Sequence, residues 1–126
     1  MSFKYIHTKK APAAVGPYSP GVISGNLIFV SGQMPIDPAT GEVVTGDAGA
    51  KATQCLKNVL AILEEAGLTA KSIVKSTIFL KDMDDFSLVN EAYAAFFKGD
   101  YPARSCVEVS RLPKDVEVEI EVIASC

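Results

Sequence analysis

The sequence has few of the residues from which disulfide frameworks, zinc sites and histidine-based active sites are built. Its 126 residues include three cysteines and one histidine. Cys55, Cys106 and Cys126 form no C-x-x-C pair and no cluster with His7, so neither a disulfide framework nor a zinc site is expected. A single histidine also argues against ribonuclease chemistry and leaves Cys106 without a Cys–His partner. Unpaired cysteines fit a reducing cytoplasm, and we expect no metal or cofactor.

Long apolar runs and concentrated positive charge are also missing. No apolar run approaches the ~20 residues of a transmembrane helix, and residues 1–5 resemble neither a secretory leader nor a transit peptide. The 12 lysines and arginines are scattered and the net charge is −3, so there is no basic stripe to bind a nucleic-acid backbone. We therefore expect a cytoplasmic protein that contacts neither membranes nor nucleic acid.

Apolar residues, by contrast, are abundant for so small a chain. They make up 48% of the sequence, whereas charged residues make up 21%. The length suits a single domain over 1–126, which can bury about two thirds of its unfolded surface without disulfides. The high apolar fraction predicts that part of the surface is covered by another subunit.

The order of the predicted elements indicates an α+β fold. Apolar residues recur at helical spacing over 47–66 and 84–98, with Asp near the start and Gly after the end of each segment. A loop is expected over 32–46. Strands are predicted over 3–8, 21–24, 27–31, 72–80, 103–109 and 116–124. Two helices on one face of a mixed sheet leave the other face bare, and we expect a second copy of the chain to cover it.

The most informative segment is 102–109, in which Arg104 stands among small and β-branched residues at the opening of a strand. Such an arginine either lies at the surface over apolar neighbours or receives an anion, because its planar fork of donors matches a carboxylate. The last strand, 116–124, alternates Val or Ile with glutamates, among them Glu119. Alternation is typical of a sheet with one wet face, but a carboxylate there could also act as a general base.

A simple hairpin of the last two strands, closed by 111–115, predicts how Arg104 and Glu119 are oriented. It places Arg104 opposite Val122 and Glu119 opposite Val107, so the two side chains point to opposite faces of the sheet. They cannot share a site within one chain, but Glu119 of one subunit could meet Arg104 of a neighbour.

Further candidates rest on weaker signals. Tyr18 lies in a Gly-Pro-Tyr-Ser-Pro loop that is stiff enough to hold the phenol over a ligand or to pack it on the sheet. Ser31 and Gly32 follow a strand, where a glycine permits close approach of a backbone. Cys106 shares the face of Arg104, which could activate the thiol, but the wall of a pocket is the better interpretation.

Several motifs together resemble the RidA/YjgF family of reactive-intermediate (enamine/imine) deaminases over nearly the whole chain. They are GPYSP at 16–20, VSGQ at 30–33 and, most specifically, PARSCVEVSRLPKDVEVEIE at 102–121. The resemblance implies a chorismate-mutase-like fold, a homotrimer with a central barrel, and sites between subunits. It implies that Arg104 binds the substrate carboxylate and that Glu119 positions water. The residues it implies for the pocket wall are Tyr18, Ser31, Gly32, Asn90 and Cys106.

The implied reaction is the cofactor-independent hydrolysis of 2-iminopropanoate or 2-iminobutanoate to a 2-keto acid and ammonia. The residue types suit it, because an arginine can fix the carboxylate while a carboxylate orients water without a metal. Two alternatives stay open. The chain could bind 2-keto acids without turnover, or it could be an interaction protein with the translation-inhibitor or ribonuclease-like activities also attached to this family. The sequence does not rank the imino acids, because the width of the pocket depends on packing between subunits.

Overall fold

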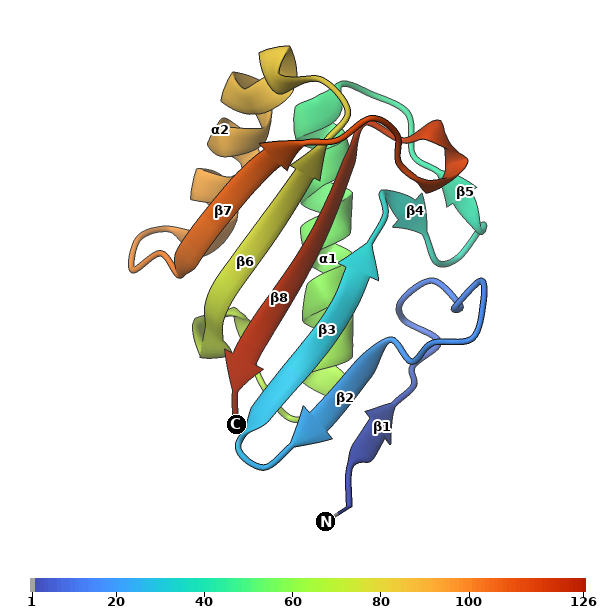
Figure 1. Cartoon of the computed structure of the whole chain (residues 1–126), viewed down its shortest axis with the longest axis vertical. Helices are drawn as coiled ribbons and strands as arrows, with labels where there is room; N and C mark the ends of the chain where they lie inside the picture. The colour runs from blue at the N-terminus through green and yellow to red at the C-terminus, as the bar shows by residue number, and fades with distance from the viewer. Residues whose placement is uncertain (1) are drawn as a thin grey trace.

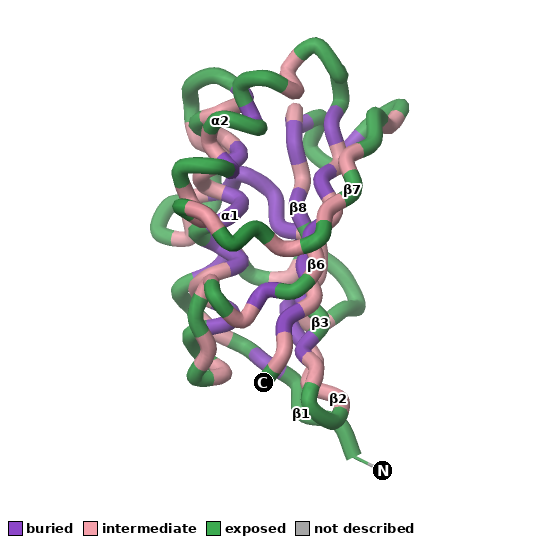
Figure 2. Tube along the Cα trace, turned by 90° about the vertical axis from the view of Figure 1, so that its left-hand side faces the viewer, coloured by how far each residue is buried: buried purple, intermediate pink, exposed green. Residues whose placement is uncertain are grey.

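The computed structural model describes residues 2–126 and consists of a six-stranded sheet with two α-helices on one of its faces (Figure 1). The helices are α1 (Ala48–Glu65) and α2 (Phe86–Phe97). The strands are β1 (Lys4–Ile6), β2 (Gly21–Ser24), β3 (Leu27–Gln33), β6 (Ile73–Leu80), β7 (Ala103–Glu108) and β8 (Val118–Ser125). Their order across the sheet is β1-β2-β3-β8-β6-β7. Seen edge-on, the helices form one layer and the strands another (Figure 2), so the predicted α+β class is confirmed.

Helix α1 begins and ends where the sequence predicts. The Asp47 carboxylate accepts a hydrogen bond from the Ala50 N–H at 2.9 Å, which satisfies one of the free donors of the first turn. After the last turn, Gly67 adopts a φ of +78°, a conformation that a glycine takes without steric cost. Between these ends α1 lies against the sheet (Figure 1), and its buried residues include Ala52, Leu56 and Val59.

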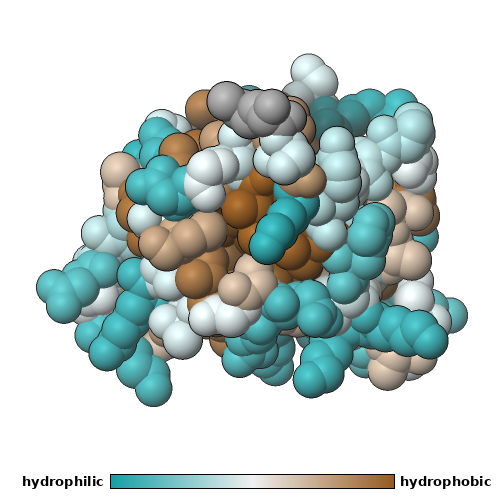
Figure 3. All heavy atoms as spheres, turned by 90° about the horizontal axis from the view of Figure 1, so that it is seen from below, coloured by the Kyte–Doolittle hydropathy of each residue, from teal (hydrophilic) through white to brown (hydrophobic). Residues whose placement is uncertain are grey.

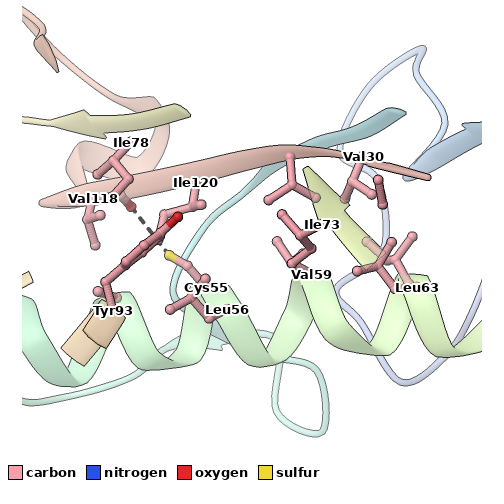
Figure 4. Packing of buried hydrophobic residues seen from close by; sticks show 14 of the residues in the cluster. Val30, Cys55, Leu56, Val59, Leu63, Ile73, Ile78, Tyr93, Val118 and Ile120 are labelled. Carbon is pink, nitrogen blue, oxygen red and sulfur yellow. Dashed lines mark hydrogen bonds between the residues drawn. The ribbon is translucent and has the colours of Figure 1, made fainter. Parts of the chain in front are cut away.

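The hydrophobic core lies between α1, α2 and the central strands. In Figure 4, Cys55, Leu56 and Val59 of α1 point toward the sheet, where Val30 and Ile120 face them. The thiol of Cys55 donates a weak hydrogen bond to the Val118 carbonyl at 3.7 Å. Each fully buried aliphatic side chain stabilises the fold by about 1.5–3 kcal/mol, so this layer accounts for much of the stability.

The predicted hairpin of the last two strands is wrong, because β6 lies between β7 and β8. Strand β7 pairs with β6 in parallel and β8 pairs with β6 antiparallel. The connection from β6 to β7 passes through α2, and a helical crossover is what places two strands in parallel. The predicted facing survives, since directly paired residues point to the same side of a sheet. Arg104 aligns with Ser76 and then Val122, whereas Glu119 aligns with Phe79 and then Val107.

Some element boundaries also differ from the prediction. The expected loop 32–46 contains a small hairpin of β4 (Ile36–Asp37) and β5 (Glu42–Val43), which belongs to a second apolar cluster around Met34 and Val116. Helix α2 is preceded by a 3-10 turn, η2 (Met83–Asp85), rather than starting at 84. Two further 3-10 turns are η1 (Ala70–Ser72) and η3 (Pro113–Asp115). These turns follow or precede strands, where the spacing of apolar residues carries no helical signal.

The sheet face opposite the helices is bare in the single chain and carries large apolar side chains. Phe29 is 44% exposed and Val107 is 43% exposed. Hydrophobic atoms also reach the surface at the end of the molecule near the β2–β3 turn, where hydrophilic side chains surround them (Figure 3). The two helices leave this face uncovered, as the order of the elements predicts, and its cover by a second copy of the chain stays a prediction.

Candidate functional site

Arg104 lies on the edge strand β7 with its guanidinium against helix α2. Nη1 donates a hydrogen bond to Oδ1 of Asn90 at 2.7 Å. The guanidinium carbon lies 5.0 Å from the ring centre of Tyr93 and 5.5 Å from that of Phe86. These contacts favour one orientation, because ring faces attract a cation. Among residues 2–126 no carboxylate lies within ion-pair distance of Arg104, so its charge is available for a ligand.

An open pocket of about 530 Å³ extends from this guanidinium along α2. Its remaining walls are mainly apolar or aromatic and come from Asn90, Tyr93, Ala94, Tyr101 and Pro102. The hydrogen bond to Asn90 uses one of the five N–H donors of an arginine. A cation at one end of an apolar pocket suits a small carboxylate with an apolar body.

Glu119 lies on the other face of the sheet, beside a hollow of about 400 Å³. Tyr18, Ser31, Gly32 and Glu121 line the same hollow. The structure therefore brings together four residues that the sequence analysis named. They are Tyr18 from the 16–20 loop, Ser31 and Gly32 from β3, and Glu119 from β8. Carboxylates and hydroxyls in one open hollow can hold and orient water.

The position of Gly32 depends on an irregularity in β3. Val30 pairs with Val122 and Gln33 with Ile120, so β3 has one residue more than β8 over this stretch. At this bulge the Ser31 hydroxyl donates to the Ser19 carbonyl at 2.6 Å. The bulge sets Gly32 against Glu119, because a Cβ added at Gly32 would lie 2.8 Å from the carboxyl carbon.

The Glu119 carboxyl is half-buried, and its pKa is raised. Burial is the main cause, because it disfavours the charged form, and the neighbouring Glu121 carboxylate adds repulsion. A carboxylate with a raised pKa binds a proton more strongly than an ordinary one. Glu119 is therefore suited to take a proton from water and return it.

Cys106 does not have the environment of a nucleophile. It packs against the core, and burial raises the pKa of its thiol more than Arg104 lowers it. The thiol form therefore predominates at neutral pH, although the thiolate is the reactive species. The interpretation of Cys106 as a wall remains a prediction.

The predicted site residues fall into two groups on opposite faces of the sheet. Arg104 and Asn90 lie together on the helix side, and Tyr18, Ser31, Gly32 and Glu119 lie together on the bare side. The sequence analysis did not predict the contacts of Tyr93 and Phe86 with the guanidinium. The spacing of residues 86, 90 and 93, which places them on one face of a helix, is the sequence signal that could have indicated these contacts.

Neither a cluster of metal-binding side chains nor a membrane-spanning helix occurs in the part of the chain that the structure describes. Within residues 2–126, no three His, Cys, Asp or Glu side chains gather in a way that would hold a metal ion. Over the same range, no helix combines the length and the apolar character needed to cross a membrane.

Comparison with known proteins assigns the chain to a family. A family model described as Endoribonuclease L-PSP matches residues 8–126. A 2-iminobutanoate/2-iminopropanoate deaminase of Escherichia coli strain K12 is 57% identical over 124 residues, which is 96% of each chain. The crystal structure of the YjgF gene product from E. coli has a TM-score of 0.92 at 56% identity and covers 97% of this chain and 98% of its own. E. coli TdcF with bound serine has a TM-score of 0.93 at 48% identity and covers 98% of both chains. The chain therefore belongs to the Endoribonuclease L-PSP family, which is the RidA/YjgF family that its motifs resemble.

Proposed function

We propose that this chain hydrolyses 2-imino acids, namely 2-iminopropanoate and 2-iminobutanoate, to 2-keto acids and ammonia. The observation that carries the proposal is the guanidinium of Arg104, which is held in one orientation at the end of an apolar pocket without a carboxylate partner in residues 2–126. A relative of 57% identity is named for this activity, which supports the same conclusion.

Arg104 binds the substrate through its carboxylate. Two parallel N–H donors of one guanidinium fit the two carboxylate oxygens, and this fork fixes the position of the adjacent imine carbon. The apolar walls beside Arg104 take the short alkyl group. Holding the reacting carbon in place is a large part of the catalysis, because imines already hydrolyse in water.

Glu119 positions and deprotonates the attacking water. A new C–O bond forms at the imine carbon as the C=N electron pair moves to nitrogen. Glu119 takes the proton of the water and returns it to that nitrogen. Glu119 then takes the hydroxyl proton of the amino alcohol and passes it to the amino group, so that the C–N bond breaks, ammonia leaves and the C=O bond forms. One imino acid and one water give one keto acid and one ammonia, so the reaction is balanced without a redox partner.

A complete site needs two copies of the chain. Arg104 and Glu119 point to opposite faces of one sheet, so one substrate can contact both only if a neighbour supplies one of them. We propose a homotrimer of the chorismate-mutase-like type, in which the bare sheet faces form a central barrel. The exposure of Phe29 and Val107 on that face supports this arrangement, because burial of such side chains stabilises an interface.

A second candidate is a module that binds small carboxylates without turnover. The structure of E. coli TdcF with bound serine favours it, since serine carries a carboxylate and has no imine to hydrolyse. The third candidate, ribonuclease-like chemistry, has less support, because the net charge is −3 and the chain has one histidine. We place the protein in the cytoplasm on the basis of its three free cysteines.

Generating the imine in situ tests the proposal. An amino acid oxidase makes 2-iminopropanoate from alanine in the presence of semicarbazide, which captures the imine as a semicarbazone. An active deaminase lowers the initial rate of semicarbazone formation, because it hydrolyses the imine before semicarbazide captures it, and in a parallel reaction without semicarbazide it speeds the release of ammonia. Binding of 2-oxobutanoate by calorimetry with no change in ammonia release would instead identify a binding module.

A further inference from the structure

Asn58 is a polar side chain inside the hydrophobic layer of α1. It is 1% exposed, and its neighbour Val59 is fully buried. Its Nδ2 donates to the carbonyls of Met34 at 3.0 Å and Ile36 at 2.9 Å. Its Oδ1 accepts a hydrogen bond from Nε2 of Gln54 at 3.0 Å. A buried amide is costly unless it is bonded, and this one uses both of its donors on a single loop.

The loop held by Asn58 begins at the β3 bulge that carries Ser31 and Gly32. Met34 follows Gly32 by two residues and lines the hollow beside Glu119. On the other side of the bulge, the Ser31 N–H donates to the Pro20 carbonyl at 2.9 Å. Between these anchors, Nε2 of Gln33 donates to the Ser31 carbonyl at 3.1 Å. The bulge is therefore fixed at both ends, and Asn58 is the anchor on the helix side.

We propose that Asn58 is a positioning residue for the Glu119 half of the site. Its two donated hydrogen bonds hold the chain after Gly32 against α1 and thereby keep the Gly32 backbone against the Glu119 carboxyl. Without these two hydrogen bonds, the bulge can move away from Glu119. The carboxyl is then no longer confined to the orientation in which it holds water. The inference rests on the proposed function, but the positioning itself can be measured without turnover.

The test compares Asn58→Ala with Val59→Ala in the full-length chain. Val59 is the next residue of α1, is also buried, and makes no hydrogen bond to the loop, so its truncation weakens the core without releasing the bulge. In Asn58→Ala we expect kcat for 2-iminopropanoate to fall by roughly 10- to 100-fold at nearly unchanged KM, because carboxylate binding by Arg104 is untouched. Val59→Ala, corrected for the folded fraction, keeps the wild-type kcat.

Amide hydrogen exchange supplies the readout that does not depend on activity. The Gly32 and Gln33 amides should exchange at least about tenfold faster in Asn58→Ala than in Val59→Ala when the two variants are equally stable. Equal exchange, or equal losses of kcat in both variants, would overturn the proposal. If wild-type protein shows no deaminase activity, the proposed function fails while the exchange comparison still decides the positioning role.

A milder variant covers the case in which Asn58→Ala does not fold. Gln54→Ala removes only the bond to Oδ1 of Asn58 and frees the amide to rotate. It should lower kcat several-fold and speed exchange at Gly32 in the same direction. A Gln54→Ala variant with wild-type kcat and wild-type exchange would then overturn the proposal.

Discussion

Replacing Gly32 by alanine should displace the Glu119 carboxyl, the proposed water-binding group, by an amount that the structure defines. The added Cβ would lie 2.8 Å from both Cδ and Oε2 of Glu119, whereas ordinary contact begins at 3.4 Å, so the carboxyl must move by about 0.6 Å. The backbone of Gly32 is outside the left-handed region, so alanine adds no backbone strain there. A misplacement of 1 Å can cost about 100-fold in rate, and we therefore expect kcat to fall by about tenfold or more.

The expected net loss of stability is at most about 2–3 kcal/mol. Crowding costs about 1–3 kcal/mol, but the reduced freedom of the unfolded chain offsets about 0.4–1 kcal/mol of this loss. Gly25→Ala is the matched control, because Gly25 has a φ of +62° and an added Cβ there meets no atom within 4 Å. It should destabilise the β2–β3 turn by about 1 kcal/mol and leave kcat unchanged.

A double-mutant cycle shows whether the Gly32 effect acts through Glu119. We measure imine hydrolysis for wild type, Gly32→Ala, Glu119→Ala and the double variant, with thermal melts for each. If the alanine acts by displacing the carboxyl, it has no further effect once Glu119 is removed. A kcat for Gly32→Ala within twofold of wild type, or the same loss in both backgrounds, would refute the reasoning.

Three other substitutions test the roles of single side chains in the same assay. Arg104→Ala should lose about 2–5 kcal/mol of transition-state binding, seen as a collapse of kcat/KM. Arg104→Lys should stay severely impaired, because it keeps the charge but loses the fork, and a nearly active lysine variant would show that charge alone suffices. Cys106→Ala should reduce activity only modestly, since burial raises the pKa of the thiol; a folded but inactive variant would make Cys106 a nucleophile. Glu121→Gln removes a repulsive charge and so lowers the pKa of Glu119. The fall of kcat on the acid side of its pH profile reports protonation of Glu119, so this fall should move to lower pH. An unchanged pH profile would contradict the role of Glu119 as base.

Local patterns were sufficient to predict most of the elements. The α1 boundaries follow from an aspartate cap, an apolar stripe and Gly67, all of which act within a few residues of the chain. Arg104 and Glu119 point to opposite faces as predicted, although the hairpin used for that prediction is wrong, because the register of β7 and of β8 with the intervening β6 preserves the same alignment. The strand that pairs with β7 was not predicted correctly. Strand pairing depends on the path of the α2 crossover, which the alternation of residues within either strand does not indicate.

For the site as well, some residues could be predicted from the sequence, whereas others depend on contacts between segments that are far apart in the chain. Arg104 was identified from residue type and position in a strand, whereas Glu119 was singled out among the glutamates of the last strand by the family resemblance. The structure places both beside hollows. Asn58 is far from both along the chain and reaches the site only through a loop that folds onto α1. Nothing in the spacing of the residues around Asn58 indicates that contact, so it required the fold.

The central claim, that one site takes Arg104 from one copy and Glu119 from another, can be tested by mixing two inactive variants. Arg104→Ala and Glu119→Ala chains are unfolded together, refolded and checked for mixed assemblies by native mass spectrometry. In randomly mixed homotrimers about one site in four combines an intact Arg104 with an intact Glu119, so about a quarter of wild-type activity should return. Mixed trimers with no activity above the separate variants would contradict a site shared between copies.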